Sequence, residues 1–374
     1  MQQQLHSLFT TVIETVPSED LCNTWAADRT IMLRKTSKRV KEAIDKIQPP
    51  TEVILNKFFW TDSCNRDCTV SNNEKLEFIM RQLILLATTC QITRIELPCC
   101  NIIVQLDILK DVIARTHTRT HIHTLTNLNL YNNSLGATGV ASLIGVLVYG
   151  KCSVLNLAHN EIGTVGIESL THSGVLMRCT NLNLCNNNIG TIGMEMIEMC
   201  KTLIRLTYLN LCYNQINTVN IDKILLQNIG LTHLDLSQNQ INILSFDRIQ
   251  IQTKYFALTD LNLSYNCIDD EGTTSLIGVL RQCTSLINLN LACNYIGTEG
   301  AYNLAEALGQ CYIIALSKLY LASNLISDIG IERLTEVLLQ RSSLTYLTLG
   351  GNGIGKDMAK NITEVLGHRV KLMF

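Results

Sequence analysis

One short pattern, L-x-L-x-x-N, recurs nine times and limits the possible fold more than any other feature of the sequence. It ends at Asn133, Asn160, Asn187, Asn214, Asn239, Asn266, Asn294, Asn324 and Asn352, which lie 25 to 30 residues apart. The residues eight positions before these asparagines, and two and ten positions after them, are apolar in every copy. A period of this length predicts a stack of similar units, each of which buries its apolar face against its neighbours.

Each unit predicts a strand, a turn and a helix. Two leucines separated by one polar residue suit a strand with one buried face. The turn after the strand leaves backbone groups inside the protein that need partners. An asparagine side chain has both a donor and an acceptor, so we expect the nine asparagines to form a structural ladder between units. Stretches such as residues 300–311 (GAYNLAEALGQC) then fit amphipathic helices.

The consensus L-x-x-L-x-L-x-x-N/C-x-L/I, with a period of 27 or 28 residues in most copies, resembles the ribonuclease-inhibitor type of leucine-rich repeat. Similar arrays occur in Ran GTPase-activating proteins and in NOD-like receptors. A degenerate tenth copy upstream has Cys100 in place of the asparagine. The resemblance covers residues 91–374 and implies an α/β fold: a right-handed leucine-rich-repeat solenoid, or horseshoe, with a parallel concave sheet and convex helices.

The units that end at Asn214 and Asn239 differ from the others. They have Asn220 and Ser245 where most units have glycine, and the step between them is 25 residues. These differences predict a locally irregular convex side.

The first ninety residues do not follow the repeat. Residues 1–50 predict a small helical N-terminal region, and residues 51–90, which begin with an edge strand, predict a cap on the first repeat. Residues 16–40 are similar to the start and end of an F-box, although the middle is about one helical turn too short. That family couples substrate receptors to a cullin ubiquitin ligase through a linker protein. The alternative for these residues is a helical cap with a solvated basic face.

Residues 348–360 (TLGGNGIGKDMAK) approach the phosphate-binding pattern G-x-x-x-x-G-K-[ST]. Asp357 stands where that pattern needs serine or threonine, and a carboxylate would repel phosphate. Gly355 also occupies a glycine column of the repeat, which it shares with Gly136, Gly163, Gly190 and Gly297. The repeat therefore explains this stretch without a nucleotide site, and we expect no cofactor.

Two groups of residues have side chains that bind metals elsewhere. His117, His121 and His123 fall at a helix-to-strand junction, and no acidic or cysteine ligand is fixed beside them. Cysteines occur at Cys64, Cys68, Cys99 and Cys100 without the usual C-x-x-C spacing. We expect no metal site, and no spacing suggests a catalytic set, so the protein is predicted not to be an enzyme.

Charge and composition exclude other classes of partner. The net charge of −2 and the pI near 6.4 give no basic surface for nucleic acid. No apolar run is long enough to cross a bilayer, and the N-terminus lacks the pattern of a signal peptide. The 15 cysteines are an odd number, which favours reduced thiols in a cytosol-like compartment. We therefore expect a cytoplasmic protein that binds no nucleic acid, membrane or small-molecule substrate.

The concave side of such a stack displays the residues six and four positions before each asparagine. Most are asparagines, with aromatic and charged side chains concentrated in two stretches and on the nearby rim. These candidate partner-binding residues are Tyr208, Tyr213, His233, Asp235, Asp260, Tyr265, Lys318, Tyr320 and Tyr346.

We therefore expect a non-enzymatic scaffold that binds a protein partner on the concave face. A second reading is an F-box-type substrate receptor of a cullin ubiquitin ligase, with residues 16–40 docking the linker protein. A third is a Ran-type GTPase-activating protein, but the long acidic C-terminal stretch of that family is missing here. Solvated asparagines, with a partner on the rim or on the N-terminal region, are the alternative to concave binding.

Overall fold

The computed structural model describes residues 51–54, 77, 80, 84, 92–115, 125–245, 256–310 and 315–374. The chain divides into two compact units, one of residues 1–135 and 142–152, the other of residues 136–141 and 153–374. The predicted helical region at 1–50, with its F-box-like stretch, lies outside the described residues, as does most of the predicted cap at 51–90.

The described part of the first unit contains three parallel strands in chain order. They are β1 (Thr51–Ile54), β2 (Ile92–Glu96) and β3 (Asn127–Asn129). The short helix η2 (Ile102–Gln105) and the helix α5 (Leu106–Arg115) follow β2. The strand expected from residue 51 onwards is present as β1.

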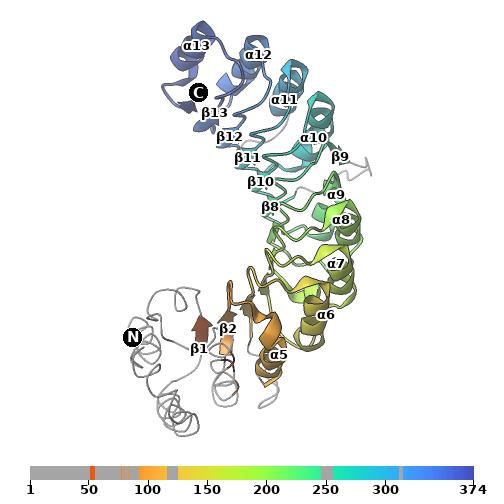
Figure 1. Ribbon diagram of the computed structural model, residues 1–374. Helices are drawn as coiled ribbons and strands as arrows, with labels where there is room; N and C mark the ends of the chain where they lie inside the picture. The colour runs from red at the N-terminus through yellow and green to blue at the C-terminus, as the bar shows by residue number, and fades with distance from the viewer. Residues whose placement is uncertain are drawn as a thin grey trace, which may run out of the picture. The chain divides into compact units, whose positions relative to one another are not determined.

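In its described residues the second unit contains one long parallel sheet (Figure 1) and a separate sheet of two strands. In the long sheet each strand pairs with its neighbours in the same register. Its order is β4 (Val154–Asn156), β5 (Asn181–Asn183), β6 (Tyr208–Asn210), β8 (His233–Asp235), β10 (Asp260–Asn262), β11 (Asn288–Asn290), β12 (Lys318–Tyr320), β13 (Tyr346–Thr348) and β14 (Lys371–Met373). The middle residue of each strand from β4 to β13 is a leucine that is at most 1% exposed, because alternate side chains of a strand point into the core.

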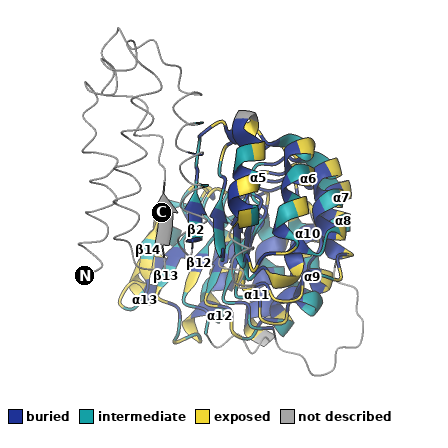
Figure 2. Ribbon diagram, turned by 90° about the horizontal axis from the view of Figure 1, so that it is seen from below, coloured by how far each residue is buried: buried dark blue, intermediate teal, exposed yellow. Residues whose placement is uncertain are grey.

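Helices lie on one side of this sheet and bury their inner faces against it (Figure 2). They are α7 (Gly163–His172), η3 (Val175–Arg178), α8 (Gly190–Glu198), α9 (Ile221–Gln227), α10 (Asp270–Gln282), α11 (Thr298–Gln310), α12 (Asp328–Leu339) and α13 (Lys356–Leu366). The helix α6 (Gly136–Leu147) is divided between the two units. The predicted α/β solenoid with a parallel sheet is confirmed. In the described part of the chain, every helix is too short or too polar to span a bilayer.

The irregular convex side predicted around Asn214 and Asn239 is also confirmed. A strand, β7 (Thr218–Asn220), precedes the short helix α9, and it pairs in parallel with β9 (Ile243–Ser245). Asn220 takes the place of the usual glycine and caps α9, since its side chain accepts a hydrogen bond from the Lys223 amide at 3.2 Å.

Candidate partner-binding surface

Positions within a repeat are numbered below from its ladder asparagine. In the second unit these asparagines are at most 8% exposed. Asn187 illustrates their contacts: its Nδ2 donates to the carbonyls of Leu157 at 2.9 Å and Leu184 at 3.0 Å, and its Oδ1 accepts from the Asn160 amide at 2.9 Å. Each side chain therefore joins its own repeat to the one before it. Since both ends of the amide group are used inside the protein, these residues are not available to a partner.

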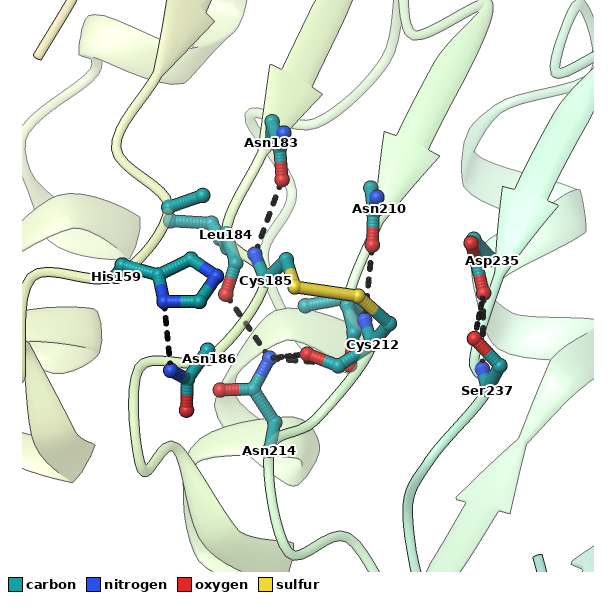
Figure 3. Close-up of a disulfide and its surroundings, with 12 residues drawn as sticks. His159, Asn183, Leu184, Cys185, Asn186, Asn210, Cys212, Asn214, Asp235 and Ser237 are labelled. Atoms are coloured by element: carbon teal, nitrogen blue, oxygen red, sulfur yellow. Dashed lines mark hydrogen bonds between the residues drawn. A yellow bond between two sulfur atoms is a disulfide. The ribbon is translucent and has the colours of Figure 1, made fainter. Parts of the chain in front are cut away.

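Asparagines at position −4 also have an internal role, which the sequence interpretation missed. The Oδ1 of Asn183 accepts from the Cys185 amide at 3.0 Å, and the Oδ1 of Asn210 accepts from the Cys212 amide at 2.9 Å (Figure 3). This Asx-type contact fixes the turn after β4, β5, β6, β8, β10 and β11, whereas β12 and β13 have Tyr320 and Thr348 at this position. The recurrent asparagine or aspartate two residues before the turn was the available signal.

Threonines at position −7 form a further ladder beside the strands. Their hydroxyls donate to the carbonyl of the residue at −7 in the preceding repeat, as from Thr207 to Thr180 at 3.0 Å and from Thr232 to Thr207 at 2.8 Å. Most positions of the −7 and −4 columns are therefore occupied by internal hydrogen bonds, with Ile287 and Tyr320 as exceptions. Position −6, which lies between them on the concave face of the sheet, is left to face outward.

We call the residues at position −6 in the second unit, with their counterpart on β14, the concave row. Strand register places them side by side: Val154, Asn181, Tyr208, His233, Asp260, Asn288, Lys318, Tyr346 and Lys371. Five of the nine predicted site residues, Tyr208, His233, Asp260, Lys318 and Tyr346, belong to this row.

The first cluster in the row consists of Tyr208, His233 and Asp260. The Tyr208 and His233 rings lie 6.1 Å apart, and His233 Nε2 lies 3.2 Å from Asp260 Oδ2. On its other side Nδ1 lies 2.8 Å from the hydroxyl of Thr232, whose proton goes to a backbone carbonyl. Both ring nitrogens thus have a polar partner. The His233 side chain is 51% exposed, so this ion pair adds at most about 1 kcal/mol to stability and can be contacted from outside.

The second cluster consists of Tyr320, Tyr346 and Lys371. The two tyrosine rings lie 5.3 Å apart, and Lys371 Nζ lies 5.7 Å from the centre of the Tyr346 ring. A cation over an aromatic face at this distance is attracted by the ring. Lys318, next to Tyr346 in the concave row, is exposed.

The remaining predicted residues lie elsewhere. Asp235 is at position −4, and its Oδ1 accepts from the Ser237 amide at 2.9 Å. Tyr213 and Tyr265 project from the turns after the strands and are 56% and 58% exposed. Their φ angles of 59° and 55° are in the left-handed region. Hydrogen bonding to the Cys293 thiol raises the pKa of Tyr265. The two tyrosines thus form part of the rim and not of the concave row.

The phosphate-loop-like stretch has a different role. The amide of Gly355, which would have to bind phosphate, donates instead to Asp328 Oδ1 at 2.8 Å. A Cβ on Gly355 would lie 2.9 Å from the other oxygen of Asp328. A carboxylate thus occupies the place of the anion, which explains the glycine without a nucleotide.

Most of the possible metal ligands, namely His117, His121, His123, Cys64 and Cys68, lie outside the described residues. Within the described ranges, no three His, Cys, Asp or Glu side chains are grouped to hold a metal ion. Burial, with Cys99 beside it, raises the pKa of Cys100 to about 11.

The expectation that all cysteines are reduced is wrong for one pair. Cys185 and Cys212 form a disulfide between two neighbouring repeats (Figure 3). Parallel register brings together two cysteines at the same position of consecutive repeats, and no secretion signal is needed for that geometry.

Comparison with known proteins agrees with the repeat. Residues 153–170, 227–242, 257–276 and 282–305 match the family described as "Leucine Rich repeat". No curated protein matches the sequence. The crystal structure of an internalin (InlF) from Listeria monocytogenes str. 4b F2365 is similar, with a TM-score of 0.50 and 15% identity over 90% of this chain and 93% of that chain. At this identity the likeness shows the fold alone. The chain is thus an α/β solenoid with segments that match leucine-rich repeats.

Proposed function

We propose that this protein is a non-enzymatic scaffold that binds a partner protein along the concave row. The observation that carries the proposal is the difference between adjacent columns. Most residues at −7 and −4, although not Ile287 and Tyr320, make hydrogen bonds within the protein. At −6, aromatic and charged side chains face outward on consecutive strands, and of these Asp260 also accepts from Thr259 and Asn288. A leucine-rich-repeat solenoid, of the ribonuclease-inhibitor type that we favour from its period, suits such a role.

The size of the row fits a protein or peptide. Six strand spacings separate β6 from β14, which corresponds to about 29 Å at roughly 4.8 Å per strand. This distance matches about nine residues of an extended segment at ~3.3 Å each. Tyr208 and Tyr346 would act as aromatic anchors near the two ends, since tyrosine is enriched among the residues that dominate binding energy.

Charge gives the row a direction. Asp260 of the row lies on β10, with Asp235 near it at position −4 of β8, whereas Lys318 and Lys371 of the row lie on β12 and β14. A partner with a basic group opposite the first pair and an acidic group opposite the second would be complementary. The F-box-type receptor and the Ran-type activator are alternative functions that rest on the sequence alone. The cytoplasmic location likewise rests on the sequence alone.

Site-specific photo-crosslinking tests the proposal. A photoreactive amino acid replaces Tyr208 or Tyr346 in the row and, as the control, the exposed Glu332 on α12. We expect the same partner to be captured from both row positions and not from Glu332. Capture from Glu332 with none from the row would contradict concave binding.

A further inference from the structure

Cys185 and Cys212 occupy position −2 of two consecutive repeats. They are 27 residues apart in the sequence, and their Cα atoms lie 4.6 Å apart. This separation is within the range that a disulfide needs. The pair therefore follows directly from the repeat period and the parallel register of β5 and β6.

The backbone around both cysteines is held by contacts that do not involve sulfur. The two amides donate to Asn183 and Asn210, as described above (Figure 3). The Cys185 carbonyl accepts from the His159 amide at 2.8 Å, and the Cys212 carbonyl accepts from the Asn186 amide at 2.8 Å. Since these bonds fix the turns, the same backbone suits two thiols or one disulfide. The reduced pair is thus preorganised for oxidation.

Access distinguishes this pair from a second pair with the same spacing. Cys152 and Cys179 also lie 27 residues apart in one column, but they are 3% and 0% exposed and remain thiols. Burial raises the pKa of Cys179 to about 12, so it stays protonated at neutral pH and does not act as a nucleophile. Cys185 and Cys212 are only half-buried, and the flanking residues at position −2, Ala158 and Ser237, are small.

We propose that Cys185 and Cys212 form a thiol–disulfide exchange site that is open to small disulfides such as oxidised glutathione. In the reduced protein one thiolate attacks the glutathione disulfide, which forms a mixed disulfide and releases one glutathione thiolate. The second cysteine, as its thiolate, then attacks the protein sulfur of the mixed disulfide and releases the second glutathione. The two protons lost by the protein thiols pass to the two glutathione thiolates, so the exchange is balanced, and excess reduced glutathione reverses it.

Cys185 is the attacking residue in this scheme. Asp235 lies on β8, beside the repeat of Cys212 and one repeat further from Cys185 (Figure 3). Its carboxylate repels the anionic glutathione more strongly at Cys212 than at Cys185. Cys212 is then the resolving residue.

Peptide mapping of the full-length protein tests the exchange site. The protein is reduced, incubated with defined mixtures of reduced and oxidised glutathione, quenched with acid and analysed by mass spectrometry. In the wild type we expect a peptide pair that is joined through Cys185 and Cys212, with little glutathione on either residue. In Cys212→Ser the resolving thiol is missing, so we expect at least tenfold more glutathione on Cys185 than in the wild type.

Cys267 provides the matched control because it is half-buried and not disulfide-bonded, and it is the sole cysteine in its column. Cys267→Ser should leave the Cys185–Cys212 linkage unchanged. A wild-type pair that stays reduced while Cys267 takes up glutathione would overturn the proposal. So would a Cys212→Ser protein that keeps its wild-type circular dichroism spectrum but carries no glutathione on Cys185. If Cys212→Ser does not fold, Cys212→Ala gives the same readout.

Discussion

Two groups of repeats within the second unit form the turn around the ladder asparagine with different backbone conformations. In the early repeats, those of Asn160 and Asn187, the residues on both sides of the asparagine are left-handed; His159 has a φ of 58° and Glu161 a φ of 56°. In the late repeats, those of Asn266, Asn294 and Asn324, left-handed φ is confined to the preceding residue, as at Tyr265. The irregular segment with β7 and β9 lies between the two groups.

Glycine is required at position +3 for a different physical reason in each group. Gly163 has a φ of 61°, and a Cβ there would meet nothing within 4 Å. Gly297 has no positive φ, but its Cβ would lie 2.9 Å from an oxygen of Asp270. The first glycine is needed for its backbone conformation and the second for space. The same column of glycines in the sequence therefore corresponds to two different turn structures.

The ladder changes with the turn. In the early repeats Asn187 Oδ1 accepts from the amides of Asn160 at 2.9 Å and Ile162 at 3.4 Å. In the late repeats Asn294 Oδ1 accepts from the Ile268 amide at 3.0 Å, and the Gly297 amide donates to Asp270 Oδ1 at 2.7 Å. A carboxylate in the late repeats thus takes over part of the role that backbone geometry has in the early ones.

Loss of a ladder asparagine should have the largest effect. Asn187→Leu leaves buried amides and carbonyls without partners, at about 1 to 3 kcal/mol for each group. We expect a destabilisation of about 4 kcal/mol or more, and a smaller one for Asn294→Leu because fewer amides depend on its Oδ1. Urea denaturation, with Glu332→Ala as the control, measures both. Equal losses would show that the two turns do not differ in energy.

Removal of the Cys185–Cys212 disulfide should have the second-largest effect on stability. In the chain-entropy model a bridge that closes about 27 residues stabilises the folded state by ~3.5 kcal/mol. Cys185→Ser with Cys212→Ser should therefore lower stability by about this amount in oxidising buffer and by much less in reducing buffer. Urea titrations in the two buffers measure the difference, and Cys267→Ser should be neutral in both. A large loss in reducing buffer would mean that the cysteines stabilise the early repeats by packing.

Partner binding should also separate the two groups. The early part of the concave row, Val154 and Asn181, has no charge or ring, whereas Tyr346 lies between Lys318 and Lys371. We expect Tyr346→Ala to weaken binding of the crosslinked partner about 30-fold, the effect of losing roughly 2 kcal/mol. Asn181→Ala should change the affinity less than about threefold. Calorimetric titration tests both, and the reverse order would move the binding site to the early repeats.

Glycine substitutions should have the smallest effect and separate the two groups most sharply. Gly163→Ala should cost about 1 to 2 kcal/mol because its φ is left-handed, and Gly163→Asn less, since asparagine tolerates that region. Gly297→Ala should lower stability by a similar amount. This loss should disappear in an Asp270→Ala background, because the carboxylate is absent. Thermal unfolding of the single variants, and of Gly163→Ala and Gly297→Ala each combined with Asp270→Ala, measures these differences. A Gly163→Ala cost that Asp270→Ala also removes would contradict the two explanations.

The sequence was sufficient to predict the fold because every repeat has the same apolar columns, and the 25-residue step with Asn220 indicated the irregular convex side. The two turn types could not be predicted, since glycine satisfies both a left-handed φ and a lack of space. The disulfide could not be predicted either: Cys152 with Cys179 at position −8 and Cys185 with Cys212 at position −2 have the same 27-residue spacing, and spacing along the chain does not determine whether two thiols are joined. The internal role of the −4 asparagines could not be predicted, because an amide side chain on a strand suits a solvated face as well as a contact with the following turn.

Hydrogen–deuterium exchange of the protein with and without its crosslinked partner tests the central claim most directly. The account predicts slower exchange in peptides that contain β6, β8 and β10 and in those that contain β12 and β13. The convex helices α10 to α12 should exchange at unchanged rates. Protection confined to those helices, or to residues 1–50, with the strands unaffected, would contradict it.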